Sequence, residues 1–312
     1  MALVPKGFPG GTLHPGDILV SNFDGSSGKQ GTGRTVVSVS PTGTIKFFFA
    51  APRSVGPAGL TAALVALRSG VVVVGSMPTT DGTSKTVRPG GLFFIGRSGH
   101  VLSYLQDSTF LDGPWDMTAN ERNPSKPVLY ISNVLNGVIT RLNLDVKHGK
   151  PTVESMTSIG AFPWRPDPAA LEVGPTGLAL SSDGRSLYVA DTDRNEIRVL
   201  HDPAAAKGGF GGSGRVVASG RPLEGPLGLT WAPNGDLIAS NGDAAGPAHN
   251  KTNINEVVEV NPATGRFVAV RQLDISGTPG AIFGVAVARL HGGESLVYVD
   301  DNTNTLDARR AM

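Results

Sequence analysis

The sequence predicts an all-β fold, a six-bladed β-propeller of four-stranded antiparallel blades that spans residues 1–312 as a single domain. Two observations support this prediction. The chain has 42 Gly and 23 Pro residues between segments rich in Val, Thr and Ser, and no long apolar stripe recurs at the 3.6-residue spacing of a helix. In addition, one unit of strands and turns returns six times along the chain.

The most regular part of each unit is a short apolar run that follows a turn and mostly ends in Asn or Asp. The six runs are DILVSN (17–22), VVVVGS (71–76), VLYISN (128–133), SLYVAD (186–191), DLIASN (236–241) and LVYVDD (296–301). Tight-turn residues such as Asp183-Gly184 and Asn234-Gly235 come directly before them. We therefore expect each run to pair with an apolar strand on the other side of that turn.

The strand before each turn begins with a Gly-Pro motif in four of the units. The copies are GPAGL (56–60), GPWDM (113–117), GPTGL (174–178) and GPLGL (225–229), with IFGV (282–285) as a looser form, and they recur every 51 to 61 residues. A third strand such as EIRVL and a fourth such as HVLSYL follow in most units. Four strands in each of six units is the pattern of a six-bladed propeller.

The last unit has strands near 282–288, 296–301 and 305–310 but no fourth strand. A missing outer strand leaves an edge with unpaired backbone groups, which proteins usually cover. We therefore expect Ala2 to Pro5 to lie against the third strand of blade six.

These units resemble NHL-type repeats, and the copy at 174–200 is the clearest instance. The resemblance covers nearly the whole chain and extends distantly to the gluconolactonase, paraoxonase and strictosidine synthase superfamily of six-bladed propellers. It implies that a ligand site lies on the face where the loops lead into the innermost strands.

The loops expected on that face are unusually long. They are residues 22–35, 76–91, 159–175 and 241–256. Long ordered loops usually serve as binding loops or lids. The prediction is a propeller that binds a small molecule, glycan or peptide on this face. The alternative is a metal-dependent hydrolase or lyase acting on lactones, esters or related small molecules.

Several side chains are candidates for this site. Trp115 and Trp164 can supply flat apolar walls, although Trp115 can also be a filler below the loop. Arg165 can bind a carboxylate, or it can pair with Asp167 and brace its own loop. The candidate catalytic residues are Asp116, an acid at the start of a channel strand, and His249, the one histidine in a loop of this face.

A divalent cation such as Ca²⁺ is implied by the resemblance, because members of that superfamily hold one with channel-facing Asn, Asp and Glu. Here Glu224 in LEGPLG resembles their Glu-Gly-Pro ligand motif, but it lies in the fifth unit and not the first. Asn133 and Asp301 are the other candidate ligands, with loop capping as the alternative role.

The bulk composition bears on partners and location. Twenty-seven basic and 26 acidic side chains give a net charge of +1, and no basic block or run of 18 apolar residues occurs, so neither nucleic acid nor membrane is an expected partner. There is no cysteine. The low Lys content and many Gly, Thr, Ser and Asn residues favour an extracellular or periplasmic protein without its leader, and we expect a monomer.

Overall fold

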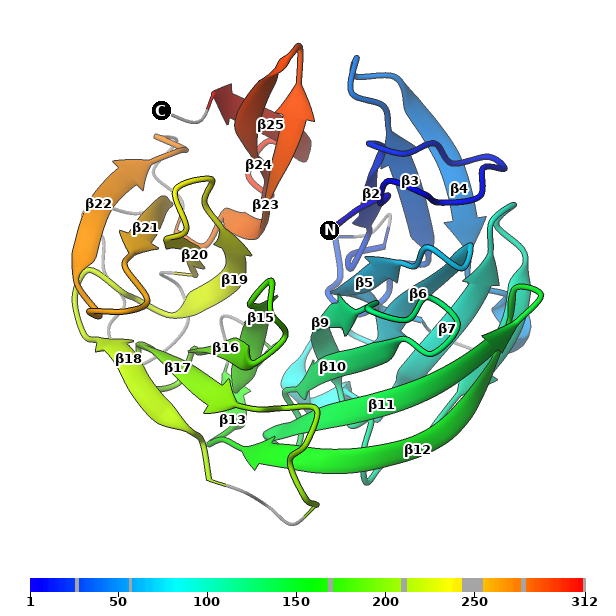
Figure 1. Cartoon of the computed structure of the whole chain (residues 1–312), viewed down its shortest axis with the longest axis horizontal. Coiled ribbons are helices and arrows are strands. Elements are labelled where there is room, and N and C mark those ends of the chain that lie inside the picture. The colour runs from blue at the N-terminus through cyan, green and yellow to red at the C-terminus, as the bar shows by residue number, and fades with distance from the viewer. Residues whose placement is uncertain are drawn as a thin grey trace.

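Strands make up nearly all of the regular structure of this chain, as the computed structural model shows (Figure 1). The structure describes residues 1–25, 28–55, 58–167, 171–208, 212–242, 255–275 and 279–310. Within these residues the helical segments are two short 3-10 turns, η1 (Arg53–Val55) and η2 (Ser84–Thr86). No described helix is long and apolar enough to cross a membrane.

Six antiparallel sheets surround a central axis, which confirms the predicted propeller. The blades contain consecutive strands, with the first strand of each innermost. Blade one contains β1 (Ala2–Leu3), β2 (Ile18–Ser21), β3 (Thr35–Val39) and β4 (Ile45–Ala50). Blade two contains β5 (Leu60–Ala66), β6 (Val71–Ser76), β7 (Gly91–Gly96) and β8 (Val101–Leu105). Blade three contains β9 (Pro114–Asn120), β10 (Val128–Asn133), β11 (Val138–Lys147) and β12 (Lys150–Ala161).

The second half of the chain continues the same order. Blade four contains β15 (Pro175–Leu180), β16 (Ser186–Asp191), β17 (Glu196–His201) and β18 (Arg215–Ser219). Blade five contains β19 (Pro226–Trp231), β20 (Leu237–Asn241), β21 (Glu256–Val260) and β22 (Phe267–Gln272). Blade six has three described strands, β23 (Ile282–Leu290), β24 (Gly293–Asp300) and β25 (Thr305–Arg310). A separate hairpin, β13 (Arg165–Asp167) and β14 (Leu171–Val173), precedes blade four.

The predicted pairing of each Asx-ended run with the strand before its turn is confirmed in three blades that begin with Gly-Pro, while Gly56 and Pro57 lie outside the described residues. Pro114 lies opposite Asn133, Pro175 opposite Asp191, and Pro226 opposite Asn241. Each innermost strand therefore begins on the same face on which the neighbouring strand ends.

The N-terminal segment lies elsewhere than predicted. Ala2–Leu3 form β1, the innermost strand of blade one, with Ala2 opposite Leu19 and Leu3 opposite Ile18. The expectation that Ala2 to Pro5 cover the third strand of blade six is therefore wrong. The physical reason is that β2 needs an inner partner, and the apolar segment directly before it supplies this strand.

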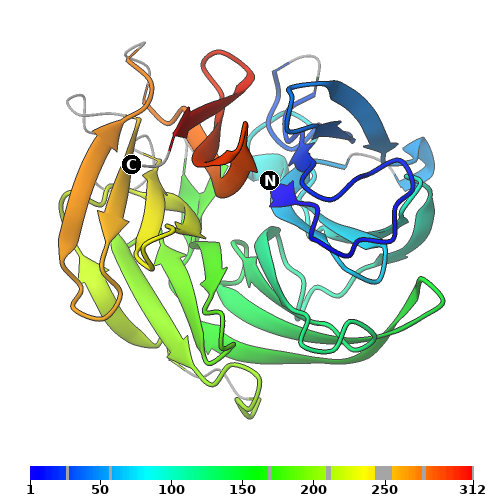
Figure 2. The same cartoon turned by 45° about the horizontal axis from the view of Figure 1, so that its top comes forward.

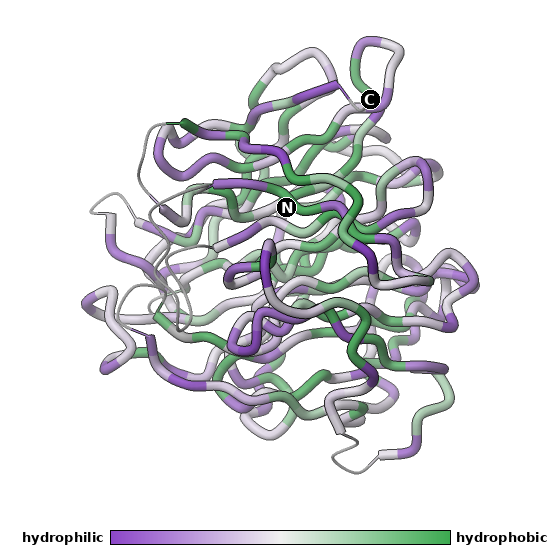
Figure 3. Tube along the Cα trace, turned by 90° about the vertical axis from the view of Figure 1, so that its left-hand side faces the viewer, coloured by the Kyte–Doolittle hydropathy of each residue, from purple (hydrophilic) through white to green (hydrophobic). Residues whose placement is uncertain are grey.

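The core lies between neighbouring blades, where strands of adjacent sheets pack face to face. Leu19 and Phe49 of blade one, for example, share a buried cluster with Leu64 and Phe93 of blade two. Figure 3 shows apolar residues concentrated along the strands, with hydrophilic residues frequent in the connections. The first and last blades meet through a similar cluster that includes Ile18 and Val297, and Figure 2 shows them side by side with the N-terminus between them.

Buried hydroxyl groups also link each blade to the next near the start of the inner strands. In blades one, three and five the next-to-last residue of the six-residue apolar run is Ser, and it donates to a backbone oxygen of the following inner strand. Blades two and four have Gly75 and Ala190 there, and a Thr of the inner strand donates instead. The donor and acceptor pairs are Ser21 to Thr61 (2.6 Å), Thr61 to Pro114 (2.6 Å), Ser132 to Thr176 (2.6 Å), Thr176 to Pro226 (3.0 Å) and Ser240 to Phe283 (2.9 Å).

Candidate functional site

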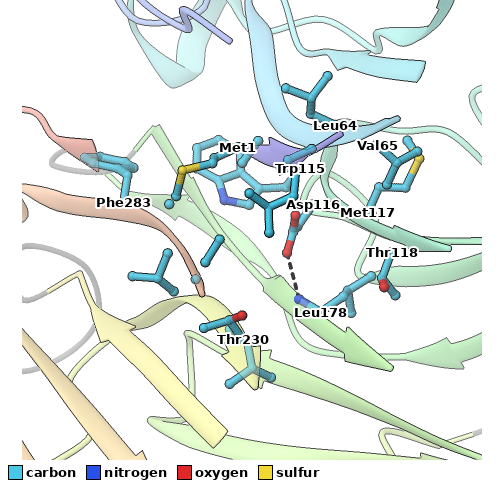
Figure 4. Close-up of a pocket in the computed structure, with 18 of the residues that line it drawn as sticks. Met1, Leu64, Val65, Trp115, Asp116, Met117, Thr118, Leu178, Thr230 and Phe283 are labelled. Atoms are coloured by element: carbon cyan, nitrogen blue, oxygen red, sulfur yellow. Dashed lines mark hydrogen bonds between the residues drawn. The ribbon is translucent and has the colours of Figure 1, made fainter. Parts of the chain in front are cut away.

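The central channel contains a cavity of about 250 Å³ between the innermost strands (Figure 4). Residues of β1, β5, β9, β15, β19 and β23 line it, so all six blades contribute. Most of the wall is apolar, with side chains such as Leu64, Leu229 and Val285. Among the described residues that line the cavity, Asp116 is the only one with a charged side chain.

Asp116 reaches the channel because of a bulge at the start of β9. Asn133 lies opposite Pro114 and Ser132 opposite Asp116, so Trp115 is the extra residue of the bulge. The Asp116 N–H donates to Ser132 Oγ at 3.1 Å, which fixes its backbone. One oxygen of its carboxylate, Oδ2, accepts a 2.8 Å hydrogen bond from the Leu178 N–H of the next blade (Figure 4).

The surroundings of Asp116 change its acidity. Removal from bulk water raises the pKa of its carboxyl group to about 6, while the Leu178 N–H and the amino group of Met1 act in the opposite direction. A carboxyl group with a pKa near 6 exchanges a proton close to neutral pH. Asp116 can therefore act as a hydrogen-bond acceptor or as an acid or base within an apolar cavity.

Trp115 lies at the end of the channel where the inner strands begin. It is 8% exposed, and its ring meets that of Phe23 edge to face with centroids 5.4 Å apart. Its apolar cluster includes Phe283 of blade six and Leu135 and Leu171 from loops of the same face. Trp115 therefore lines the cavity and also packs beneath the loops, and its binding role stays a prediction.

The predicted binding residues Arg165 and Asp167 lie on the inserted hairpin and Trp164 directly precedes it, and none of the three lines the channel cavity. Arg165 Nε is 2.6 Å from Asp193 Oδ1, and its Nη1 is 3.4 Å from Asp167 Oδ2. Asp167 is buried, whereas Trp164 is 47% exposed. These contacts favour the brace interpretation of Arg165, which fastens the hairpin to blade four. A binding role for Trp164 stays a prediction.

The three predicted metal ligands have different surroundings. Asn133 is buried, and its Nδ2 donates to the Val138 carbonyl at 3.0 Å, which is the loop-cap role. Glu224 Oε1 is 2.9 Å from Arg221 Nε. Asp301 is exposed and directly follows the last residue of β24. No group of three or more His, Asp or Glu side chains among the described residues could hold a metal ion, and the assignment of these three residues as ligands stays a prediction.

The position of Asp301 also corrects the sequence alignment of the units. Asp300, and not Asp301, lies opposite Ile282, as Asn133 lies opposite Pro114. The inner strand of blade six begins without Gly-Pro, so the sequence offered no anchor for its register. Asp300 Oδ1 accepts the Asn302 N–H at 3.0 Å and caps the loop. The other catalytic candidate, His249, lies outside the described residues.

A second buried carboxylate occupies the same structural position in blade four. Asp191 is fully buried, and neither of its carboxylate oxygens has a hydrogen-bond partner in the described part of the chain. Arg194 and Arg198 lie 3.6 Å away. Burial raises the pKa of Asp191 to about 6, with both arginines acting in the opposite direction. Asp191 lies away from the lining of the channel cavity.

Sequence reasoning missed the polar residues Thr118 and Thr230 in the channel wall. Thr118 was within reach of pattern analysis, because residues two apart on a strand share a face and Asp116 was already a candidate. The Leu178 N–H that binds Asp116 gave no signal, since a backbone donor depends on how the next blade is placed.

The chain shares its fold with several solved β-propeller structures, although it matches no model of a known protein family and no curated protein. A protein of unknown function from Bacteroides caccae is 17% identical, with a TM-score of 0.53, covering 90% of this chain and 81% of that one. A putative 6-phosphogluconolactonase from Bacteroides fragilis is 15% identical, with a TM-score of 0.51 and coverages of 93% and 80%. Regucalcin from Agrobacterium tumefaciens, a calcium-binding protein, is 15% identical, with a TM-score of 0.52 and coverages of 89% and 83%.

The fold and the channel cavity together define the class: a six-bladed β-propeller with lactonase-like and regucalcin-type structural neighbours. At these identities the likeness extends to the fold alone. The assignment of the units to NHL repeats stays a prediction.

Proposed function

We propose that this propeller binds a small, mostly apolar molecule in its central channel, with a hydrogen-bond donor of the molecule directed at Asp116. The observation that supports this is a cavity of about 250 Å³ with apolar walls and a single charged side chain. Ligand sites commonly combine a concave apolar wall with a few polar groups that fix orientation.

The chemistry of Asp116 selects the polar group of the ligand. Leu178 occupies one carboxylate oxygen, which leaves the other as an acceptor toward the cavity. A carboxylate oxygen that is removed from water without a hydrogen-bond donor is costly, and a donor from the ligand offsets that cost. Molecules with an N–H or O–H group on an apolar body match both features.

The binding surface predicted over the loops, with Trp164 and His249, remains a separate proposal. Residues 168–170 and 243–254, which belong to its expected wall, lie outside the described residues. On composition alone we also infer an extracellular or periplasmic monomer with no nucleic-acid or membrane partner.

The direct test of channel binding is a fluorescence titration with N-phenyl-1-naphthylamine, a neutral apolar dye with one N–H donor. Ala62→Phe and Ala286→Phe each place a large side chain in the cavity wall. Ala269 is exposed on β22, so Ala269→Phe is the matched control. We expect the two channel variants to lose at least tenfold in affinity and the control to match the wild type. Equal binding by all four proteins would contradict the proposal.

A second candidate function is hydrolysis of a lactone or ester, which the pKa of Asp116 near 6 favours. The name of one structural neighbour, a putative 6-phosphogluconolactonase, agrees with it. In this reaction the ionised Asp116 would accept a proton from water as the water attacks the carbonyl carbon, and would return that proton to the alkoxide oxygen when the acyl C–O bond breaks.

Hydrolysis is tested with a chromogenic aryl acetate and a simple γ-lactone. Because the active form is the carboxylate, the rate is expected to rise as the pH passes through about 6 and to level off above it. Asp116→Asn should remove this pH-dependent rate. If the wild type and Asp116→Asn turn over these substrates at the same rate, hydrolysis by Asp116 is contradicted and binding remains the proposed function.

A further inference from the structure

A second hollow of about 330 Å³ lies at the far end of the channel, where the inner strands finish. Three segments form it: the end of β9 with residues 121–122, the turn at 180–184 after β15, and Arg68 after β5. Thr118 and Ala119 line both this hollow and the channel cavity, so the two spaces adjoin along β9. We call this hollow the exit groove.

The exit groove has the opposite chemical character to the channel. Its charged lining residues in the described structure are Arg68, Arg122 and Glu121, and Asn120 and Ser182 add polar groups. Two guanidinium groups and one carboxylate give this lining an excess of positive charge.

Arg68 and Glu121 neutralise each other. The Arg68 N–H donates to Glu121 Oε1 at 2.7 Å, its Nε is 3.8 Å from Oε2, and its guanidinium group donates to the Glu121 carbonyl. Burial raises the pKa of Glu121, and Arg68 opposes this effect. The carboxylate of the groove is therefore already bound by a cation of the protein.

Arg122 is the remaining cation. Its Nη2 donates to the backbone oxygen of Asp183 across the groove, which holds the side chain against blade four. The nearby Asp183 carboxylate is exposed, and its Oδ1 accepts from Ser181 Oγ and the Arg185 N–H of its own turn. The Asp183 contact uses one of the five N–H donors of the Arg122 guanidinium group, so donors remain for an anion.

Distance along β9 separates the two ends of the combined space. Asp116 and Asn120 are four residues apart, about 13 Å on an extended strand, and Arg122 lies two residues further. An anionic group at Arg122 is thus well away from the Asp116 carboxylate. A molecule with an apolar body and one anionic end fits this arrangement along its length.

From these observations we infer that the exit groove is an anion subsite continuous with the channel, and that the channel ligand is an amphipathic molecule with a carboxylate or sulfonate end bound by Arg122. This inference rests on the proposed channel binding. It adds the class of ligand, because the channel alone accepts neutral apolar molecules equally well.

The test compares two dyes that differ by one group. 6-Anilino-2-naphthalenesulfonate has the ring system and N–H of the neutral dye N-phenyl-2-naphthylamine, with an added sulfonate at the opposite end of the naphthalene from the N–H. Both are titrated into the wild type, Arg122→Gln, Arg122→Lys and Arg185→Gln. Arg185 is exposed in the adjacent turn and does not line the groove, so it controls for loss of one surface charge.

We expect Arg122→Gln to lower the affinity for the sulfonate dye about tenfold, while the affinity for the neutral dye changes less than twofold. Arg122→Lys should restore part of the loss, and Arg185→Gln should resemble the wild type. An equal loss for both dyes in Arg122→Gln, or no loss for either, would overturn the anion subsite. Failure of the neutral dye alone to bind the wild type would contradict the proposed function and leave the subsite standing, whereas binding of neither dye would overturn both.

Discussion

Asp116 and Asp191 are two aspartates whose pKa burial raises to about 6, but their surroundings differ. Asp116 accepts a backbone hydrogen bond and lines a cavity, so a ligand can reach it. Asp191 has no exposed surface and no hydrogen-bond partner in the described residues. The same shift in pKa thus accompanies a candidate functional role in one residue and a cost in folding stability in the other.

We predict that Asp191→Asn stabilises the protein. The pKa of Asp191 is about 6 in the folded state against 3.8 for a free side chain, so ionisation destabilises the fold as the pH rises from about 4 to 6 and the loss persists above. Asn133 and Asn241 occupy the equivalent position in blades three and five and donate to backbone carbonyls. At pH 8 the variant should gain about 1–3 kcal/mol in free energy of unfolding.

Urea unfolding at pH 8 and pH 4 measures this difference. Near pH 4 the gain should shrink strongly, because Asp191 is then neutral in the folded state and close to its own pKa of 3.8 in the unfolded state, so little of the ionisation penalty remains. The matched reverse change, Asn133→Asp, should lower stability at pH 8. A gain of the same size at both pH values would show that the charge of Asp191 is not its cause.

At the scale of elements, the inner strands are held by hydroxyl groups that cross from one blade to the next. Ser240 is fully buried, donates to the Phe283 carbonyl at 2.9 Å and accepts the Gly228 N–H at 2.8 Å. Such contacts fix the bulges at the start of the inner strands, and these bulges decide which side chains face the channel.

Ser240→Ala is expected to lower the free energy of unfolding by about 1–3 kcal/mol, since a buried carbonyl and a backbone N–H lose their partner. Ser103→Ala is the control, because Ser103 is exposed on the outer strand β8. Its effect should stay within about 0.5 kcal/mol. Chemical denaturation measures both, and equal small losses would mean that the hydroxyl contacts contribute little.

Sequence patterns predicted some strands correctly and missed others. The repeated turn, apolar run and Asx end predicted six second strands, and Gly-Pro located the inner strands of blades three to five. Strand β1 escaped prediction because two residues carry no periodicity. The sequence alignment placed Asp301 at the position that Asp300 occupies in the structure, because blade six lacks the Gly-Pro motif that set the register elsewhere. Asp116 was found as an acid at a channel strand, but its partner Leu178 and the exit groove depend on packing between blades that no local pattern encodes.

At the scale of the whole molecule, the junction between blades six and one differs from the other five. Val299 precedes Asp300, where blades one, three and five have Ser, and β23 contains no Thr like those that donate in blades two and four, so no hydroxyl is available here to reach the next inner strand. Apolar packing around Ile18, Val39, Ala288 and Val297 holds the two blades together. We therefore regard this junction as the place where the ring opens most easily.

Native-state hydrogen exchange tests this view of the ring. The amides of β2 and β24 should exchange sooner than those of β6, β10 and β16, because opening this junction exposes them without disturbing the other blades. Uniform protection across all second strands would contradict it. Slower exchange in β2 and β24 than in the other second strands would show that this junction is the most stable one.

The central claim is that the channel, with Asp116 in its wall, is the binding site. A crystal structure of the protein with N-phenyl-1-naphthylamine tests it most directly. We predict that the dye lies among the inner strands between Trp115 and Thr118, with its N–H directed at the Asp116 carboxylate. Dye bound to the loop face or to the outer strands, with the channel unoccupied, would contradict the claim.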